Sequence, residues 1–198
     1  MLKPKLKSIK YERWDFQDEF WKAPEYETML SAGYGAGKTY AISMELLKLC
    51  HLNRGLPGGL LAPNMKMFRR DVLPTLKEIA QANGFEVEYK RTDGELHIPI
   101  TGSTVYVFHS EDEGASIRGP NLAFGVVNEV SMCSENAYKA FLARIRLKTA
   151  PHRQIKSSGT PEGFGWTYDY FVLSQEPTRR IIYGDTRKNK AVAEDYQQ

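Results

Sequence analysis

The chain has 198 residues, of which 41% are hydrophobic and 26% charged, which is the balance of one folded domain rather than of a disordered protein. No apolar run approaches the roughly 20 residues needed to cross a bilayer, and the lysine-rich beginning lacks the apolar segment of a secretory signal. Two cysteines exclude a disulfide framework and predict reduced thiols in a cytosolic compartment. Because the chain lacks a long apolar run, we expect no membrane partner.

Basic residues gather in one part of the chain although the net charge is only +3. Residues 136–161 contain six lysines and arginines and no acidic residue. A partner with a phosphate backbone would explain this run. A solvated helix face followed by a basic loop would explain it equally well.

The pattern of apolar residues predicts strands that alternate with helices. Residues 1–10 hold four lysines and no acid, which indicates a flexible basic arm, and residues 11–27 have the spacing of a short helix with an aromatic face. Further on we expect, in chain order, a strand at 28–32, a helix at 38–50, a strand at 60–62, a helix at 65–82 that is bent or restarted at Pro74, a strand at 124–128, a helix at 134–147 and a strand at 154–158.

The segment between residues 85 and 109 has a different pattern. Three alternating runs, at 85–91, 96–100 and 104–109, are joined by tight turns, which is typical of antiparallel strands. The whole chain is therefore predicted to be an α/β domain with a mainly parallel central sheet flanked by helices, plus an antiparallel strand insert. The strand order is left open.

A glycine-rich segment follows the first predicted strand and reads Ser-Ala-Gly-Tyr-Gly-Ala-Gly-Lys-Thr from residue 31 to residue 39. A polyphosphate must be held by several backbone N–H groups, and a glycine-rich turn lets the backbone come close enough. In this interpretation the phosphate-binding residues are Gly33, Tyr34, Gly35, Ala36, Gly37, Lys38 and Thr39, with the Thr39 hydroxyl also binding Mg²⁺. The usual pattern has glycine where this chain has Ala32, and a surface turn beside a chance Gly-Lys-Thr is the alternative.

A second polar site is predicted at the end of the buried strand at 124–128. A nucleoside triphosphatase of the P-loop fold needs an acid near the metal and a group that orients or deprotonates the attacking water. Glu129 would be that catalytic group, and Asn128 stands where an aspartate normally helps to hold Mg²⁺. The amide gives up a full charge, so we expect weaker Mg²⁺ binding. Alternatively, both residues simply end a strand.

With these motifs placed, nearly the whole chain resembles the ATPase domain of the large terminase subunit of tailed double-stranded DNA bacteriophages. The resemblance rests on the phosphate loop, on Leu61-Ala62-Pro63-Asn64 and Met67-Phe68-Arg69-Arg70, on Ser116 to Asn121, on Val127-Asn128-Glu129 and on Ser158-Gly159-Thr160-Pro161. It implies an ATP- and Mg²⁺-dependent motor that translocates double-stranded DNA into a procapsid.

The resemblance also implies roles for individual residues. Ser158, Gly159, Thr160 and Pro161 look like the coupling motif, which links the state of the γ-phosphate to motion of the DNA-gripping parts. Arg118 is positioned like a catalytic arginine supplied to a neighbouring subunit, although it could equally pair with the acidic residues at 111–113. Gln17 is similar to the glutamine that binds the adenine edge, and it could also be a surface helix residue.

The family implies partners and a domain division. We expect a portal, a small terminase subunit and a ring of identical subunits on the procapsid, in the host cell cytoplasm. Residues 11–185 would be the motor domain and 186–198 the start of a linker; a nuclease domain has no room after Pro161, so we expect no nuclease activity from this chain. A helicase, or a nucleotide-gated DNA-binding module with little turnover, is the alternative function.

Overall fold

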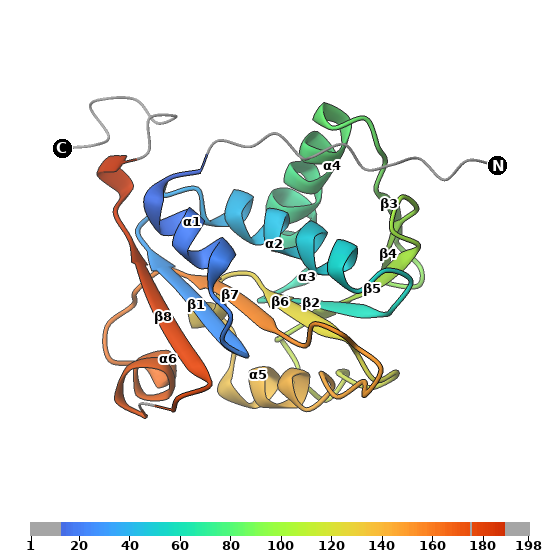
Figure 1. Ribbon diagram of the computed structural model, residues 1–198. Helices are drawn as coiled ribbons and strands as arrows, with labels where there is room; N and C mark the ends of the chain where they lie inside the picture. The colour runs from blue at the N-terminus through green and yellow to red at the C-terminus, as the bar shows by residue number, and fades with distance from the viewer. Residues whose placement is uncertain (1–12, 175, 189–198) are drawn as a thin grey trace.

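The computed structural model describes residues 13–174 and 176–188, and within them eight strands form one sheet in the order β3-β4-β5-β2-β6-β7-β1-β8 (Figure 1). The strands are β1 (Glu27–Ala32), β2 (Gly58–Ala62), β3 (Glu88–Lys90), β4 (Glu95–Ile98), β5 (Ser103–His109), β6 (Phe124–Val127), β7 (Ile155–Gly159) and β8 (Arg179–Gly184). The α-helices are α1 (Asp15–Lys22), α2 (Lys38–Leu52), α3 (Met65–Met67), α4 (Leu73–Ala82), α5 (Glu135–Leu142) and α6 (Trp166–Tyr168). Short π-helical or 3-10 turns are η1 (Phe68–Val72), η2 (Val130–Met132), η3 (Asp169–Leu173) and η4 (Thr186–Lys188). The predicted arm at 1–10 lies outside the described residues, as does 189–198 of the expected linker.

The strand pairing confirms the predicted class of fold. Every neighbouring pair from β5 to β8 in the sheet is parallel, whereas β3 pairs with β4 and β4 with β5 in antiparallel fashion. The antiparallel insert therefore extends one edge of a parallel sheet. The strand order, which the sequence left open, places β1 between β7 and β8.

Helices cover both faces of the sheet, with α1, α2 and α4 on one side and α5 and α6 on the other (Figure 1). Successive strand residues point to opposite faces, so a strand buried on both sides has few polar positions. Leu30 and Leu60 pack into the core beneath α2 and α4, and their neighbours Met29 and Leu61 pack into the core against α5.

The strand expected at 60–62 begins two residues earlier, so Gly58 and Gly59 belong to β2. A Cβ at Gly59 would lie 2.6 Å from the ring of Phe141, which packs from α5 against the sheet. The side chain is missing because the aromatic ring takes its place. Such a close approach cannot be read from the sequence of the strand alone.

The helix expected at 65–82 is continuous but irregular, as the proline predicted. A π-helical turn, η1, separates α3 from α4, and Pro74 lies in the first turn of α4, directly after the π-helical turn. Asn83 ends the helix and Gly84 follows with φ of 73°.

The helix predicted at 134–147 begins as expected but ends earlier. The hydroxyl of Ser134 accepts a hydrogen bond from the N–H of Ala137, which confirms the predicted cap. The helix ends at Leu142 because the following segment pairs with the loop before β6: the Leu122 N–H donates to Arg144 O, and the Leu147 N–H donates to Leu122 O. The strand expected at 85–91 is likewise reduced to β3.

Four of the six basic residues of the 136–161 run have separate structural roles. Lys156 is completely buried, and Lys139 forms an ion pair with Glu135 one turn away. Arg144 and Arg146 donate hydrogen bonds to the loop at 117–121. The expectation that the run would be a solvated helix face and loop is wrong for Lys156.

Candidate nucleotide-binding site

The predicted site segments meet at one edge of the sheet. The strands from β5 to β8 are parallel, so their carboxyl ends lie at the same edge. The glycine loop follows β1, Asn128 and Glu129 follow β6, and Thr160 follows β7. Because β6, β7 and β1 are consecutive in the sheet, these three segments are neighbours.

The glycine loop has the local geometry that a phosphate-binding turn requires. Gly35 and Gly37 have φ of 74° and 75°, a left-handed conformation that glycine adopts without strain. Gly37 immediately precedes α2, so the first N–H groups of that helix face the loop. Within the loop Ala36 is buried and Tyr34 is exposed. The small residues of the loop carry no polar side chain, so its backbone N–H groups are the polar groups that it offers to a phosphate.

Ala32, where glycine is usual, fits because of the neighbouring strand. Ala32 is buried at the end of β1 and pairs with Gly184 of β8. A Cβ at Gly184 would lie only 2.8 Å from the Cβ of Ala32. The glycine on β8 thus provides the space that the alanine on β1 fills.

Lys38 contacts both the loop and the predicted catalytic carboxylate. Its Nζ donates a hydrogen bond to Gly33 O at 3.0 Å and lies 3.7 Å from Oε1 of Glu129. Burial lowers the pKa of Lys38, and the charge of Glu129 partly opposes that shift. The ammonium is therefore held between the loop and Glu129.

Glu129 in turn contacts the segment after β7. Its Oε2 accepts hydrogen bonds from the N–H of Thr160 at 3.2 Å and from the Thr160 hydroxyl at 3.3 Å. The backbone of Glu129 is left-handed, with φ of 51°, which is unfavourable for a residue with a side chain. One carboxylate thus joins Lys38 of the loop to Thr160 of the predicted coupling motif.

Asn128 is positioned as a candidate metal-site residue. Its side chain is 1% exposed, and within the described residues its Oδ1 has no hydrogen-bond partner. A buried amide oxygen without a partner is costly, and a metal-bound water would satisfy it. The described residues contain no cluster of three His, Cys, Asp or Glu side chains, but Mg²⁺ beside a nucleotide is held largely by water and phosphate oxygens. Asn128 therefore fits the predicted Mg²⁺ site, and Thr39, the second residue of α2, stays a predicted ligand.

The other residues of the predicted coupling motif differ in exposure. Ser158 is completely buried on β7, and its hydroxyl has no hydrogen-bond partner among the described residues. A Cβ at Gly159 would lie 3.0 Å from the hydroxyl of Ser131, so the strand end packs closely on η2. Pro161 is exposed where the chain leaves the sheet.

Gln17 is brought to the loop by α1. Its side chain is 2% exposed, its Nε2 donates to Gly37 O at 3.4 Å, and its Oε1 accepts from the N–H of Trp14. A side chain at Gly37 would be unfavourable, because the residue has φ of 75° and a Cβ would lie 2.9 Å from Gln17 Nε2. The alternative that Gln17 is a surface helix residue is therefore wrong, while its contact with adenine stays a prediction.

Arg118 is not brought to the other site residues. It is exposed, and its Nε donates to Ala115 O within its own loop. In residues 13–174 and 176–188 no ion pair joins it to the acidic residues at 111–113. Asp112 instead accepts from the N–H groups of Gly114 and Ser116. The alternative of a loop arginine paired with this cluster is thus not observed.

One residue near the loop was missed by the sequence. The hydroxyl of Thr186, just after β8, donates to Tyr34 O at 3.2 Å, and a Cβ at Gly33 would lie 2.9 Å from it. The only available signal was an apolar run at 181–182, since β8 itself was not predicted.

A parallel sheet whose first strand leads through a glycine loop into a helix that begins with lysine and threonine defines a P-loop nucleoside-triphosphatase fold. Residues 29–193 match the family model described as terminase large subunit, T4likevirus-type, N-terminal. The chain belongs to this family of terminase large subunits, which confirms the resemblance read from its motifs.

Solved structures of phage terminases share the fold. The large terminase of a thermophilic bacteriophage has a TM-score of 0.78 and 20% identity, over 91% of this chain and 48% of that one. The large terminase ATPase domain of Thermus phage P74-26 has a TM-score of 0.66 and 18% identity, over 88% and 82% of the two chains. The HK97 bacteriophage large terminase has a TM-score of 0.66 and 16% identity, over 87% and 39%.

This chain spans about half the length of the first of these terminases, a protein also solved in complex with ADP and with ATP-γ-S. No curated protein sequence matches the chain. Among the described helices, none has the length and apolar character to span a membrane.

Proposed function

We propose that this chain is the ATP-hydrolysing motor domain of a terminase large subunit, and that it drives double-stranded DNA into a procapsid. The observation that carries the proposal is the path from Lys38 through Glu129 to Thr160. It joins a phosphate-binding lysine, a carboxylate able to act on water, and the end of a strand that would move when the carboxylate shifts on hydrolysis. A passive nucleotide-binding domain has no need of such a path.

The roles in hydrolysis follow from this arrangement. The loop N–H groups and Lys38 bind the β- and γ-phosphates, and the phosphate charge draws the Lys38 ammonium away from Glu129. Glu129 then orients or deprotonates the attacking water, because its Oε1 no longer faces a cation. Its Oε2 stays bound to Thr160, so a shift of the carboxylate on hydrolysis reaches β7.

Mg²⁺, when bound, would neutralise charge on the phosphate oxygens. The Thr39 hydroxyl and the Asn128 amide are the residues that would hold it. An amide attracts a hydrated cation less than a carboxylate does, so we expect this site to need more Mg²⁺ than one with aspartate at position 128.

Arg118 is proposed to act on the site of a neighbouring subunit. Its side chain is exposed and makes no hydrogen bond or ion pair with the phosphate loop or Glu129 of its own described chain. Its loop is anchored to the segment after α5, because Arg144 donates hydrogen bonds to Ile117 O and Gly119 O. The active assembly would be a ring of identical subunits, working with a portal and a small terminase subunit in the host cytoplasm.

The decisive test is Glu129→Gln, which keeps the size of the side chain and removes its charge. We expect phosphate release at saturating ATP and Mg²⁺, measured with and without linear double-stranded DNA, to fall to background, while binding of a fluorescent ATP analogue is retained. Glu135→Gln is the matched control, because Glu135 is a partly exposed glutamate in the first turn of α5, where it forms an ion pair with Lys139. Full turnover in Glu129→Gln would refute the assignment.

A second candidate is a nucleotide-gated DNA-binding or assembly module with little turnover, which Asn128 favours because it weakens the metal site. The same experiment separates the two. If the unmodified protein, with or without DNA, releases phosphate no faster than Glu129→Gln, the gated module is the better description.

A further inference from the structure

A buried cation lies beneath α1, near the start of the strand that leads into the predicted coupling motif. Lys156 of β7 is 0% exposed, and its Nζ donates to Ala23 O at 2.7 Å, to Phe20 O at 3.3 Å and to the hydroxyl of Thr28 at 3.2 Å. The last carbonyl groups of a helix have no partner within the helix and carry partial negative charge. Lys156 therefore caps the carboxyl end of α1.

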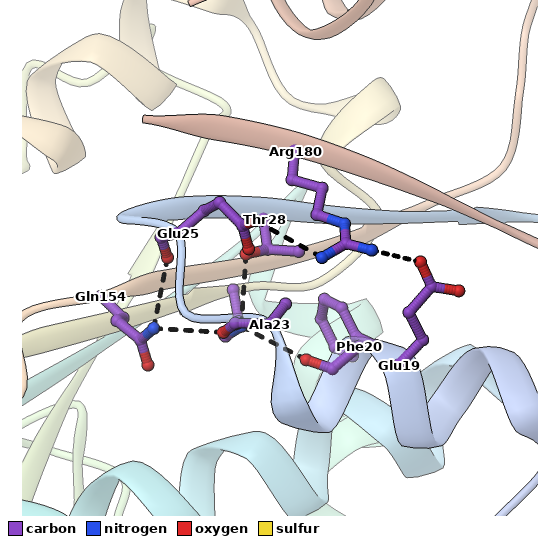
Figure 2. Close-up of polar contacts among 8 residues, drawn as sticks. Glu19, Phe20, Ala23, Glu25, Thr28, Gln154 and Arg180 are labelled. Atoms are coloured by element: carbon purple, nitrogen blue, oxygen red, sulfur yellow. Dashed lines mark hydrogen bonds and ion pairs between the residues drawn. The ribbon is translucent and has the colours of Figure 1, made fainter. Parts of the chain in front are cut away.

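Other side chains fix the same end of the helix. Lys48 of α2 donates to Trp21 O and pairs at 2.7 Å with Glu45, a carboxylate that is 1% exposed. Figure 2 shows Gln154 directed at the main chain of Ala23 and Glu25, and Arg180 of β8 placed between Glu19 and Glu25. The carboxyl end of α1 is thus attached to β7, α2 and β8.

The opposite end of α1 lies at the phosphate loop. Gln17 donates to Gly37 O, and the ring of Trp14 would lie 3.4 Å from a Cβ at Gly37. A helix of this length spans about 12 Å and transmits a displacement of one end to the other. The position of Gln17 at the loop therefore depends on how the far end of α1 is held.

Lys156 also belongs to the strand that leads to Thr160, whose N–H and hydroxyl bind Glu129. The same segment thus contacts α1 near the start of β7 and the predicted catalytic carboxylate just after the strand ends. Burying a charge is costly, and an apolar residue of similar volume would often be as stable or more so. A buried lysine at this position calls for a role besides stability.

We propose that Lys156 is a positioning residue for the base end of the nucleotide site, because it holds α1 against β7 and so keeps Gln17 in place to bind the edge of an adenine. This inference rests on the proposed function, since it takes Gln17 as the residue that contacts the base. It gives β7 a second role, because the strand that leads to Thr160 then also determines how well the site distinguishes ATP from GTP.

The test compares Lys156→Met, Gln17→Ala and the double variant. Methionine keeps the length of the lysine stem and removes the three hydrogen bonds. Fluorescent analogues of ATP and GTP give the ratio of their dissociation constants, inorganic tripolyphosphate reports phosphate binding alone, and hydrogen exchange of residues 15–22 reports how firmly α1 is held without nucleotide. Tyr138→Phe is the matched control: it removes a buried hydrogen bond, to Glu27, on the opposite face of the sheet and touches nothing in α1.

We expect Lys156→Met to speed exchange in α1 and to reduce the ATP preference about fivefold, the effect of one hydrogen bond, with tripolyphosphate affinity unchanged. In the Gln17→Ala background Lys156→Met should reduce the preference no further, and Tyr138→Phe should leave both readouts at their original values. The inference is refuted if exchange in α1 stays slow, or if α1 loosens while the ATP preference stays intact.

The failure of each idea has its own signature. If Gln17→Ala keeps the full ATP preference, the base contact is wrong, and the role of Lys156 at the base end fails with it. If the unmodified protein binds neither analogue, the proposed function itself fails, before any variant is compared.

Discussion

Thr160 donates two hydrogen bonds, from its backbone N–H and from its hydroxyl, to a single carboxylate oxygen of Glu129. The other oxygen of Glu129 faces Lys38. The carboxylate therefore cannot change its orientation toward the phosphate loop without changing its contact with the end of β7. This relationship gives the predicted coupling motif a direct physical connection to the proposed site of hydrolysis.

Thr160→Val should slow turnover without weakening nucleotide binding. Valine removes the hydroxyl donor and leaves the backbone one, and the loss of one hydrogen bond to a charged group is expected to cost about 1–1.5 kcal/mol, or about tenfold in kcat. Phosphate release and titration with a fluorescent ATP analogue would measure the two effects. The control is Thr75→Val, which removes a hydroxyl of α4 that donates a hydrogen bond to Asp71 O of η1. A loss confined to affinity would contradict the positioning of Glu129 by Thr160.

Asn128→Asp should lower the Mg²⁺ concentration needed for half-maximal phosphate release by about tenfold, because a full negative charge replaces a dipole at a buried position. The measurement is a Mg²⁺ titration at saturating ATP. An unchanged Mg²⁺ requirement would mean that Asn128 does not contact the hydrated metal.

Gly184→Ala should destabilise the domain by about 1–3 kcal/mol, since the added Cβ would lie 2.8 Å from the Cβ of Ala32 and 3.0 Å from the ring of Phe16. Ala32→Gly in the same chain removes the first of these clashes, so the cost in the double variant should be smaller than the sum of the single ones. Urea unfolding measures each contribution. Additive costs would show that the two positions do not share this space.

The stability of the domain should depend on pH through Lys156. Burial lowers the pKa of Lys156 to about 8, whereas an unfolded lysine titrates near 10.4. Between these values the unfolded chain binds more protons than the folded one, so stability rises with pH in this window. Relative to Lys156→Met, the unmodified protein should gain about 2 kcal/mol between pH 7.5 and 9.5.

Paired urea unfolding curves at the two pH values measure this difference, and contributions from other groups largely cancel between the two proteins. If the unmodified protein gains no stability relative to Lys156→Met between the two pH values, burial does not lower the pKa of Lys156 in the folded protein.

The features predicted from the sequence are those that local chemistry dictates. The loop around Gly35 and Gly37, the Ser134 cap and the helical irregularity next to Pro74 each follow from the conformational preferences of a few neighbouring residues, and the structure has all three. Periodicity likewise predicted the parallel core and the antiparallel insert.

The features that were missed depend on contacts between distant segments. Helix α5 stops early because Leu122 pairs with the residues after it, and β8 is an edge strand recognised mainly through its pairing with β1. Lys156 was placed in a basic run because the carbonyl groups that surround it come from α1, more than a hundred residues earlier. No local pattern contains that information.

The backbone of Glu129 carries a final consequence. A left-handed conformation at a residue with a side chain costs roughly 1 kcal/mol or more, and glycine would relieve most of that cost while removing the carboxylate. Selection for thermal resistance alone would therefore favour losing the residue on which hydrolysis is proposed to depend. A glutamate in this strained backbone fits a role for the turn in function rather than in stability.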